Sequence, residues 1–274
     1  MRISIAFALV SVAACGGVER APVDPLSRLD LRAAMSTGDV APVGLALEDR
    51  ARFVFDRDAG LLRIDGETVT TVIDMASMPN PGPTAPINPP FTDLVAIAPN
   101  VFAITALNDG YLLDTQALTL TQHFCYLPGE EQGTPVVASQ RTDAIAYDAE
   151  NDRIYAQPIS YDAVGTFVQS QLARYDATTG TDNLWNGVEP TVAATAMMVS
   201  ATDRDRLILG QGPIVSFATM ASSNPVVVED LSRFGVSSID GMAIDRAANT
   251  LVVVDSVADA VFDIDLAQLD IALD

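Results

Sequence analysis

The stretch that decides the fold lies near the C-terminal end, where residues 240–265 read DGMAIDRAANTLVVVDSVADAVFDID. It contains three short apolar runs, which are Asp240–Asp245, Thr250–Asp255 and Ala260–Asp265. Polar turns rich in Asp, Ala and Asn separate these runs. Short β-branched runs between such turns predict consecutive antiparallel strands joined by hairpins.

The same template recurs along the chain. The copy that begins at Asp143 has the runs Asp143–Asp148, Arg153–Ala156 and Leu172–Asp176. Further copies begin near residues 43, 93 and 195, so the starts at 43, 93, 143, 195 and 240 lie 50, 50, 52 and 45 residues apart. Fourth strands are expected at Val69–Ile73, Leu118–Thr121 and Val226–Leu231, and another near Leu184.

Units of about 40 to 50 residues with four short strands are typical of β-propeller blades. One such sheet cannot bury both of its faces alone, whereas packing against two neighbours in a ring does so. We therefore predict an all-β fold, a β-propeller of five four-stranded blades, or six with a degenerate one. The last blade lacks an obvious outermost strand, which either the tail Leu269–Leu273 or the N-terminal stretch Leu29–Arg32 could supply.

The copies at Asp143–Ala156 and Asp240–Asp255 resemble YVTN and NHL repeats of extracytoplasmic propellers. Each has an apolar pair, an Asp, a short turn with Asn and a second apolar run. The resemblance implies a fold more than a task, because propellers host enzymes, adhesins and scaffolds alike.

The N-terminus predicts export. Met1-Arg2 precedes the apolar run Ile3–Val12 and then Ala13-Ala14-Cys15, which is a signal peptide pattern too short to span a membrane. The ending also resembles the lipobox of bacterial lipoproteins, which implies a signal peptide at 1–14, an acylated Cys15, a tether over 15–28 and a propeller over 29–274. The alternative is an ordinary signal cut near Ala14 that leaves a free protein. Since Gly16 is not an acidic retention signal, the resemblance places the protein at the outer membrane or cell surface.

Charge and composition exclude several functions. Acidic residues outnumber basic ones by 36 to 15, which gives a net charge of −21, and the chain contains no Lys and one His. This field opposes nucleic-acid binding, and the missing Lys removes Schiff-base chemistry and a complete phosphate-binding loop. If Cys15 carries lipid, Cys125 is the only other cysteine, so no intramolecular disulfide can form.

Two sets of residues are candidate sites. Asp93, Asp143 and Asp240 are predicted to open their blades at the same position, where their carboxylates could converge on an axial Ca²⁺. The alternative, which we favour, is that each one satisfies nearby backbone N–H groups. His123 and Cys125 share one face of a predicted strand, but two ligands are too few for a metal site. Acid-rich segments such as Asp56–Gly60, Asp148–Asp152 and Asp203–Asp205 are expected to be hairpin turns.

These observations favour a binding or scaffold module of the bacterial envelope, whose partner is an envelope protein or a small ligand. No constellation for acid–base or nucleophilic catalysis stands out, so a non-enzymatic role is favoured. One rival is a Ca²⁺-dependent hydrolase that resembles lactonase propellers, in which a Glu, an Asn and an Asp surround the metal. In this sequence only the Asp ligand has possible counterparts, and no Glu or Asn can be identified for the other two positions. Another rival is an adhesion or surface-layer component.

Overall fold

The protein is described here by a computed structural model. The described residues are 21–35, 40–48, 51–80, 90–107, 109–125, 139–161, 164, 167–181, 193–200, 206–219 and 222–269. Within these ranges, no helix has both the length and the apolar character needed to cross a membrane. Cys15, the predicted signal peptide and the segment 203–205 lie outside these ranges.

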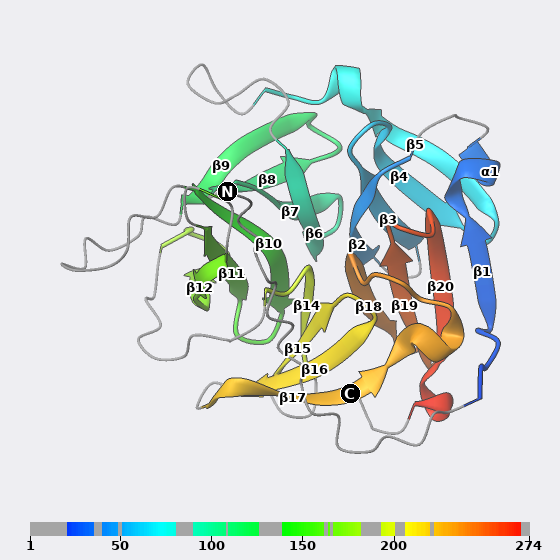
Figure 1. The fold of residues 1–274 in the computed structure, drawn as a ribbon. Helices are drawn as coiled ribbons and strands as arrows, with labels where there is room; N and C mark the ends of the chain where they lie inside the picture. Colours follow the sequence, from blue (N-terminus) through cyan, green and yellow to red (C-terminus); the bar gives the residue numbers. More distant parts are fainter. Residues whose placement is uncertain are drawn as a thin grey trace, which may run out of the picture.

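Five antiparallel sheets of four strands each form the molecule and confirm the predicted fold class. Seen along the axis, the innermost strand of every sheet faces a common centre (Figure 1). These innermost strands are β2 (Pro42–Glu48), β6 (Phe91–Ala98), β10 (Ser139–Asp148), β14 (Ala196–Val199) and β18 (Gly241–Asp245). The second strands are β3 (Ala51–Asp56), β7 (Val101–Ala106), β11 (Arg153–Tyr161), β15 (Arg206–Gln211) and β19 (Thr250–Asp255).

Outside these lie β4 (Gly60–Asp65), β8 (Asp109–Asp114), β12 (Phe167–Ser170), β13 (Ala173–Asp176), β16 (Ile214–Thr219) and β20 (Ala260–Asp265). The outermost strands are β1 (Ser27–Asp30), β5 (Thr68–Asp74), β9 (Thr119–Cys125) and β17 (Ser222–Asp230). The short helices are α1 (Leu31–Met35), η1 (Met75–Ser77), η2 (Leu231–Phe234) and η3 (Leu266–Gln268).

The ring is closed by the N-terminal stretch. Strand β1 pairs antiparallel with β20, with Ser27 opposite Asp263 and Asp30 opposite Ala260, so the last sheet runs β1-β20-β19-β18. Figure 1 shows the first described strand beside the last one. Of the two strands that the sequence left open for this place, the N-terminal one occupies it.

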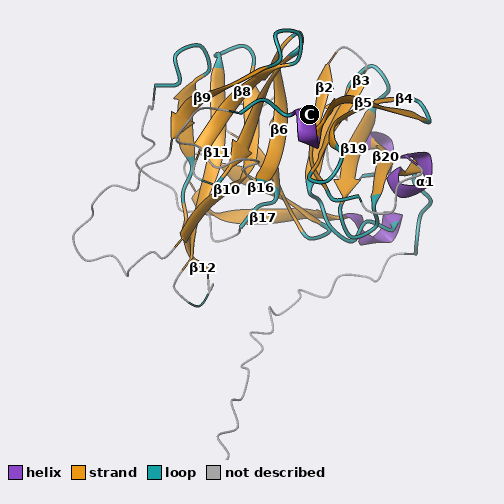
Figure 2. Cartoon of the chain, turned by 90° about the horizontal axis from the view of Figure 1, so that it is seen from above, coloured by secondary structure: helices purple, strands orange, loops and turns teal. Residues whose placement is uncertain are grey.

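The third blade departs from the regular pattern. Both β12 and β13 pair with β11, so the third strand of this sheet is in two pieces. The fourth strand predicted near Leu184 lies outside the described residues. Strands β10 and β11 have 10 and 9 residues, and Figure 2 shows β12 at the far end of this long hairpin, beyond the other blades.

The core lies between neighbouring blades. The Phe53 and Phe102 rings of the first two blades lie 4.9 Å apart, and those of Phe55 and Phe91 lie 4.8 Å apart. One cluster joins the first blade to the last and includes Leu45, Val54, Val252, Val254 and Val261. Each sheet thus buries its apolar faces only through its neighbours, as the repeat predicted.

The acidic turns have the predicted chemistry where they are described. Asp56 Oδ1 accepts hydrogen bonds from the backbone N–H groups of Asp58 and Ala59, at 2.9 and 2.8 Å. Asp148 Oδ1 accepts from the N–H groups of Glu150 and Asn151, at 3.1 and 3.3 Å. These carboxylates complete hairpin turns.

Candidate functional site: the central channel

The innermost strands enclose a channel of about 200 Å³ along the axis. Each strand contributes three consecutive residues to its wall, and Arg246 follows the last of them. The triplets are Leu45–Leu47, Leu94–Ala96, Ile145–Tyr147, Met197–Val199 and Met242–Ile244. These triplets define which residues occupy equivalent positions in the five blades.

The residue directly before each triplet is small in four blades. Gly44 and Gly241 occupy this position in the first and last blades because neighbouring backbones approach closely there. A Cβ on Gly44 would lie 2.7 Å from the backbone N of Leu94, and one on Gly241 would lie 2.6 Å from that of Leu45. Such contacts are too short for any side chain. Ala144 and Ala196 precede the triplets of the third and fourth blades.

Asp93 is the exception at this position. Its side chain is buried, and Oδ2 accepts a hydrogen bond from the backbone N–H of Ile145 in the next blade at 2.8 Å. Oδ1 accepts from the N–H of Leu94, also at 2.8 Å. Burial raises the pKa of Asp93 well above its usual value, even though these two hydrogen bonds lower it. The carboxyl group of Asp93 thus bridges the second and third blades. At the same position in the first and last blades, glycine lets the neighbouring backbones touch directly.

Asp143 and Asp240 lie two residues before their triplets, so the structure does not place them at the position of Asp93. The innermost strands of the first three blades share an irregularity at this place, with register shifts between Pro42 and Gly44, between Phe91 and Asp93, and between Thr142 and Ile145. In the second blade Thr92, and not Asp93, therefore occupies the position of Asp143. Such bulges change which face a side chain occupies. The equivalents of Asp143 and Asp240 in three blades are therefore Val43, Thr92 and Thr195.

The threonines at this position tie one blade to the next. The Thr92 hydroxyl donates to the backbone carbonyl of Thr142 at 2.5 Å, and that of Thr195 donates to the carbonyl of Ile239 at 2.5 Å. We call the ring formed by these five positions, Val43, Thr92, Asp143, Thr195 and Asp240, the upstream rim of the channel.

The carboxylates of the upstream rim have protein partners. Asp143 forms an ion pair with Arg141 at 2.6 Å, and the Arg141 guanidinium lies 4.9 Å from the centre of the Tyr161 ring. Burial raises the pKa of Asp143, although the nearby Arg141 and Arg57 lower it. Asp240 Oδ2 accepts a hydrogen bond from the N–H of Ser256 at 2.8 Å.

The repulsion that Asp143 and Asp240 exert on Asp93 contributes to its raised pKa, so the three acids share one end of the channel. Across the described residues, however, no three His, Cys, Asp or Glu side chains are arranged so that they could hold a metal ion. Asp93 and Asp240 accept hydrogen bonds from backbone N–H groups, whereas the partner of Asp143 is the Arg141 side chain. An axial Ca²⁺ site at Asp93, Asp143 and Asp240 stays a prediction.

The other end of the channel, where the innermost strands finish, is the downstream rim, formed by Glu48, Tyr147 and Arg246. Glu48 Oε1 accepts from the N–H of Asn100 at 2.9 Å, and the Tyr147 hydroxyl donates to Asp152 Oδ1 at 3.1 Å. Sequence reasoning missed both Arg141 and Arg246, because nothing in their neighbourhoods distinguishes an arginine near the axis from one in an ordinary turn.

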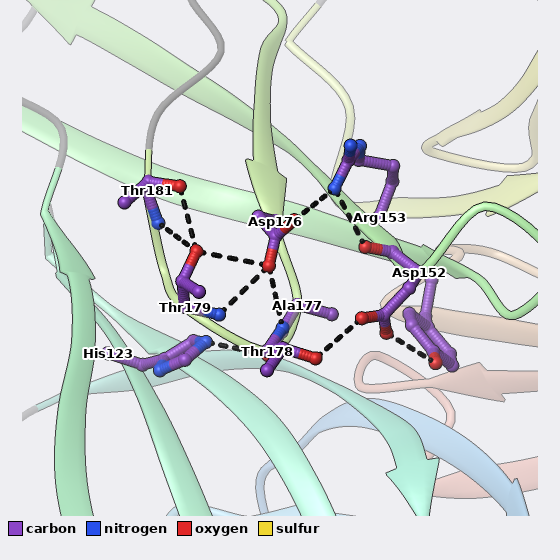
Figure 3. A network of polar contacts seen from close by, with 9 residues as sticks. His123, Asp152, Arg153, Asp176, Ala177, Thr178, Thr179 and Thr181 are labelled. Atoms are coloured by element: carbon purple, nitrogen blue, oxygen red, sulfur yellow. Dashed lines mark hydrogen bonds and ion pairs between the residues drawn. The ribbon is translucent and has the colours of Figure 1, made fainter.

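His123 lies away from the channel and joins two blades. Its Nε2 is 2.8 Å from the backbone carbonyl of Ala177, in the turn after β13 (Figure 3). In the same turn Asp176 pairs with Arg153 and accepts from the N–H of Thr179 at 2.9 Å. Cys125 ends strand β9, but its side chain is not part of what the structure describes. A joint role of Cys125 with His123 therefore stays a hypothesis.

The chain is thus a five-bladed β-propeller with a central channel, a fold that generally supports binding or scaffolding. No known family profile matches its sequence, and no curated protein is detectably similar.

Solved structures are similar only at a distance. The chain aligns with a chain of the mitotic checkpoint complex at 11% identity and a TM-score of 0.46, covering 96% of this chain and 98% of that one. It aligns with the extracellular domain of a hybrid two-component system from B. thetaiotaomicron at 10% identity and a TM-score of 0.45, covering 83% of this chain and 27% of that one. For a GH74 xyloglucanase from Xanthomonas campestris the values are 12% and 0.40, with coverage of 75% and 34%. The chain spans about a third or less of the last two proteins, and TM-scores below 0.5 carry no argument about its task.

Proposed function

We propose that this protein is an exported lipoprotein whose propeller binds a ligand or partner in the bacterial envelope. The observation that carries the proposal is a closed ring with a channel lined by all five innermost strands. Small-molecule sites are commonly concave and apolar, with a few polar groups at their edges. Most residues that line the channel have apolar side chains, and polar side chains lie at its two ends.

The N-terminal sequence supplies the means of attachment. Acylation of Cys15 would bury several alkyl chains, each methylene being worth about 0.8 kcal/mol. A net charge of −21 repels anionic lipid surfaces, so a covalent anchor is needed to hold this domain at a membrane.

The distance between anchor and ring is short. Strand β1 begins at Ser27, which is 27 − 15 = 12 residues after Cys15. A fully extended chain of this length spans at most about 40 Å. The anchor would hold the propeller by the outer edge of its last blade, because β1 is the outermost strand there, and would leave the channel free.

Replacement of Cys15 tests the anchor. We expect the wild-type protein to sediment with membranes and to carry the added mass of its acyl chains, whereas Cys15→Ala moves to the soluble fraction without that mass. Cys125→Ala is the matched control and should stay with the membranes. Continued sedimentation of Cys15→Ala, or a soluble wild-type protein, would overturn lipidation at this residue.

A further inference from the structure

We infer that the channel binds a small amphipathic anion, an aliphatic or aromatic group that ends in a carboxylate, with the carboxylate at Arg246. This assigns a ligand class to the binding module proposed above and rests on that proposal. The argument uses the wall of the channel, its size and the charges at its two ends.

The wall is apolar at nearly every side chain. The lining residues are Leu, Ile, Val, Ala and Met apart from Tyr147 and Arg246. Seven of the sixteen, Met197 and Met242 included, are buried in the clusters between blades, so a ligand can contact mainly the others. Several of these side chains are only half-buried, Met198, Val199 and Ile244 among them. Apolar surface that water can still reach gains free energy when a ligand covers it, at roughly 25 cal/mol per Å².

The size limits the ligand. A protein cavity of about 150 Å³ holds benzene. A channel of about 200 Å³ therefore suits a ligand only slightly larger, with roughly eight carbon atoms. Octanoate and phenylacetate are of this size.

Arg246 provides the charge. It lies in the turn after β18, is exposed and lines the channel, and in the described part of the chain its guanidinium has no ion pair. Other described arginines are engaged, for example Arg32 with Asp259 at 2.7 Å and Arg52 with Asp263 at 2.9 Å. A guanidinium binds a carboxylate through two parallel hydrogen bonds.

The acids near Arg246 are engaged by backbone N–H groups. Asp245 Oδ1 accepts from Ala248 at 3.1 Å, and Asp148 closes its own turn. Glu48 Oε1 accepts from Asn100 at 2.9 Å, whereas Glu48 Oε2 is buried without a hydrogen-bond partner among the described residues. Their fields still reduce the attraction that an anion feels, so the affinity should be modest and should weaken with added salt.

The opposite end sets the orientation. Asp93, Asp143 and Asp240 all lie toward the upstream rim, where Arg141 already neutralises Asp143. The upstream arginines Arg141 and Arg57 act on Asp143, and Asp93 and Asp240 lie at the same end. The downstream rim offers Arg246, which has no ion pair among the described residues. The apolar end of the ligand therefore points upstream.

Titration with octanoate, measured by calorimetry, tests the inference on the full chain carrying Cys15→Ala, which leaves every residue of the ring unchanged. We expect saturable binding of octanoate and at least tenfold weaker binding of octylamine, which has the same chain and the opposite charge. Arg246→Ala should weaken octanoate binding by about tenfold, as loss of a charge-assisted pair predicts. Arg63→Ala is the matched control, because Arg63 is exposed on β4 and pairs with Asp65 away from the channel.

A second variant tests the wall. Leu47→Trp adds bulk at a half-buried position of the wall and should abolish binding while the melting temperature stays close to that of the parent. No octanoate binding at millimolar concentration, equal binding of octylamine, or unchanged binding by Arg246→Ala would overturn the inference. Its failure is separable from that of the lipoprotein proposal, because membrane fractionation of Cys15→Ala does not depend on any ligand.

Discussion

The innermost strands of this propeller meet through a ring of small residues, and one position of that ring holds a carboxylic acid. At Gly44 and Gly241 the backbones of adjacent blades are too close for a Cβ. At Asp93 the blades are bridged by a side chain that accepts two backbone hydrogen bonds. The second and third blades are therefore joined through a titratable group, so their contact should respond to pH.

Asp93→Asn should change how stability depends on pH. The pKa of Asp93 is raised in the folded protein, whereas in the unfolded chain it is about 3.9. As the pH rises above that value, the unfolded chain loses its proton first, so the free energy of unfolding falls until the folded pKa is passed. Asn cannot ionise, so we expect the variant to gain stability relative to wild type as the pH rises above about 4, until the folded pKa is passed, as measured by urea unfolding.

Asp176→Asn should change the pH dependence of stability in the opposite direction and serves as the comparison. Hydrogen bonds from Thr179 and Arg153 lower the pKa of Asp176, so its contribution to stability is present above pH 4 and is lost as the pH falls through the folded pKa. This variant should lose stability relative to wild type as the pH rises. The same direction of change in both variants would contradict the environment described for Asp93.

At this scale the sequence was only partly informative. It showed that Asp93, Asp143 and Asp240 lie near the starts of their blades, but their alignment was off by one residue for Asp93. The shifts in strand register around Thr92 and Asp143 depend on pairing with the neighbouring strand. A one-residue bulge leaves no mark in the spacing of apolar residues, and a one-residue change moves a side chain to the other face.

Among the elements, strand β1 and helix α1 have the largest effect for their length, because they complete the last blade. Leu31 is fully buried in the cluster that also contains Val252 and Val261, and Arg32 pairs with Asp259. The strands of the repeats could be predicted from the local sequence pattern. Strands β19 and β20, for example, match the predicted runs Thr250–Asp255 and Ala260–Asp265. The strand that pairs with β20 could not be predicted from a local pattern, because this pairing joins the two ends of the chain.

Leu31→Ala tests the contribution of this closure. Removal of a fully buried leucine side chain costs about 2 to 5 kcal/mol, through lost apolar contact and the cavity that remains. We expect a corresponding drop in the urea midpoint. Leu118→Ala makes the same chemical change at a side chain that is 59% exposed and should shift stability by no more than about 0.5 kcal/mol. Similar effects of the two substitutions would mean that the closure contributes little.

On the scale of the whole molecule, stability comes from contacts between blades that repeat around the ring. Apolar clusters join the first blade to the second and the last blade to the first, and polar contacts such as Thr92 to Thr142 follow the same direction. The acids around the axis accept hydrogen bonds from the protein itself.

Calcium should therefore have little effect on unfolding. We expect the melting temperatures in EDTA and in millimolar Ca²⁺ to agree within about 2 °C, because a ligand stabilises only when it binds the native state. Differential scanning calorimetry, with Mg²⁺ as the control ion, measures this. A rise of many degrees with Ca²⁺ alone would instead support the Ca²⁺-dependent hydrolase and the site at Asp93, Asp143 and Asp240.

Pairing of β1 with β20 also governs how the protein is made. Ser27 bonds to Asp263 across a separation of 236 residues, so the first strand to leave the ribosome must wait for one of the last. Until that strand arrives, an exposed edge is available for pairing with other chains, and loop closure over such a distance is slow. A chain that stops before β20 cannot complete the circle, and we expect chaperones and proteases of its compartment to recognise it as unfinished.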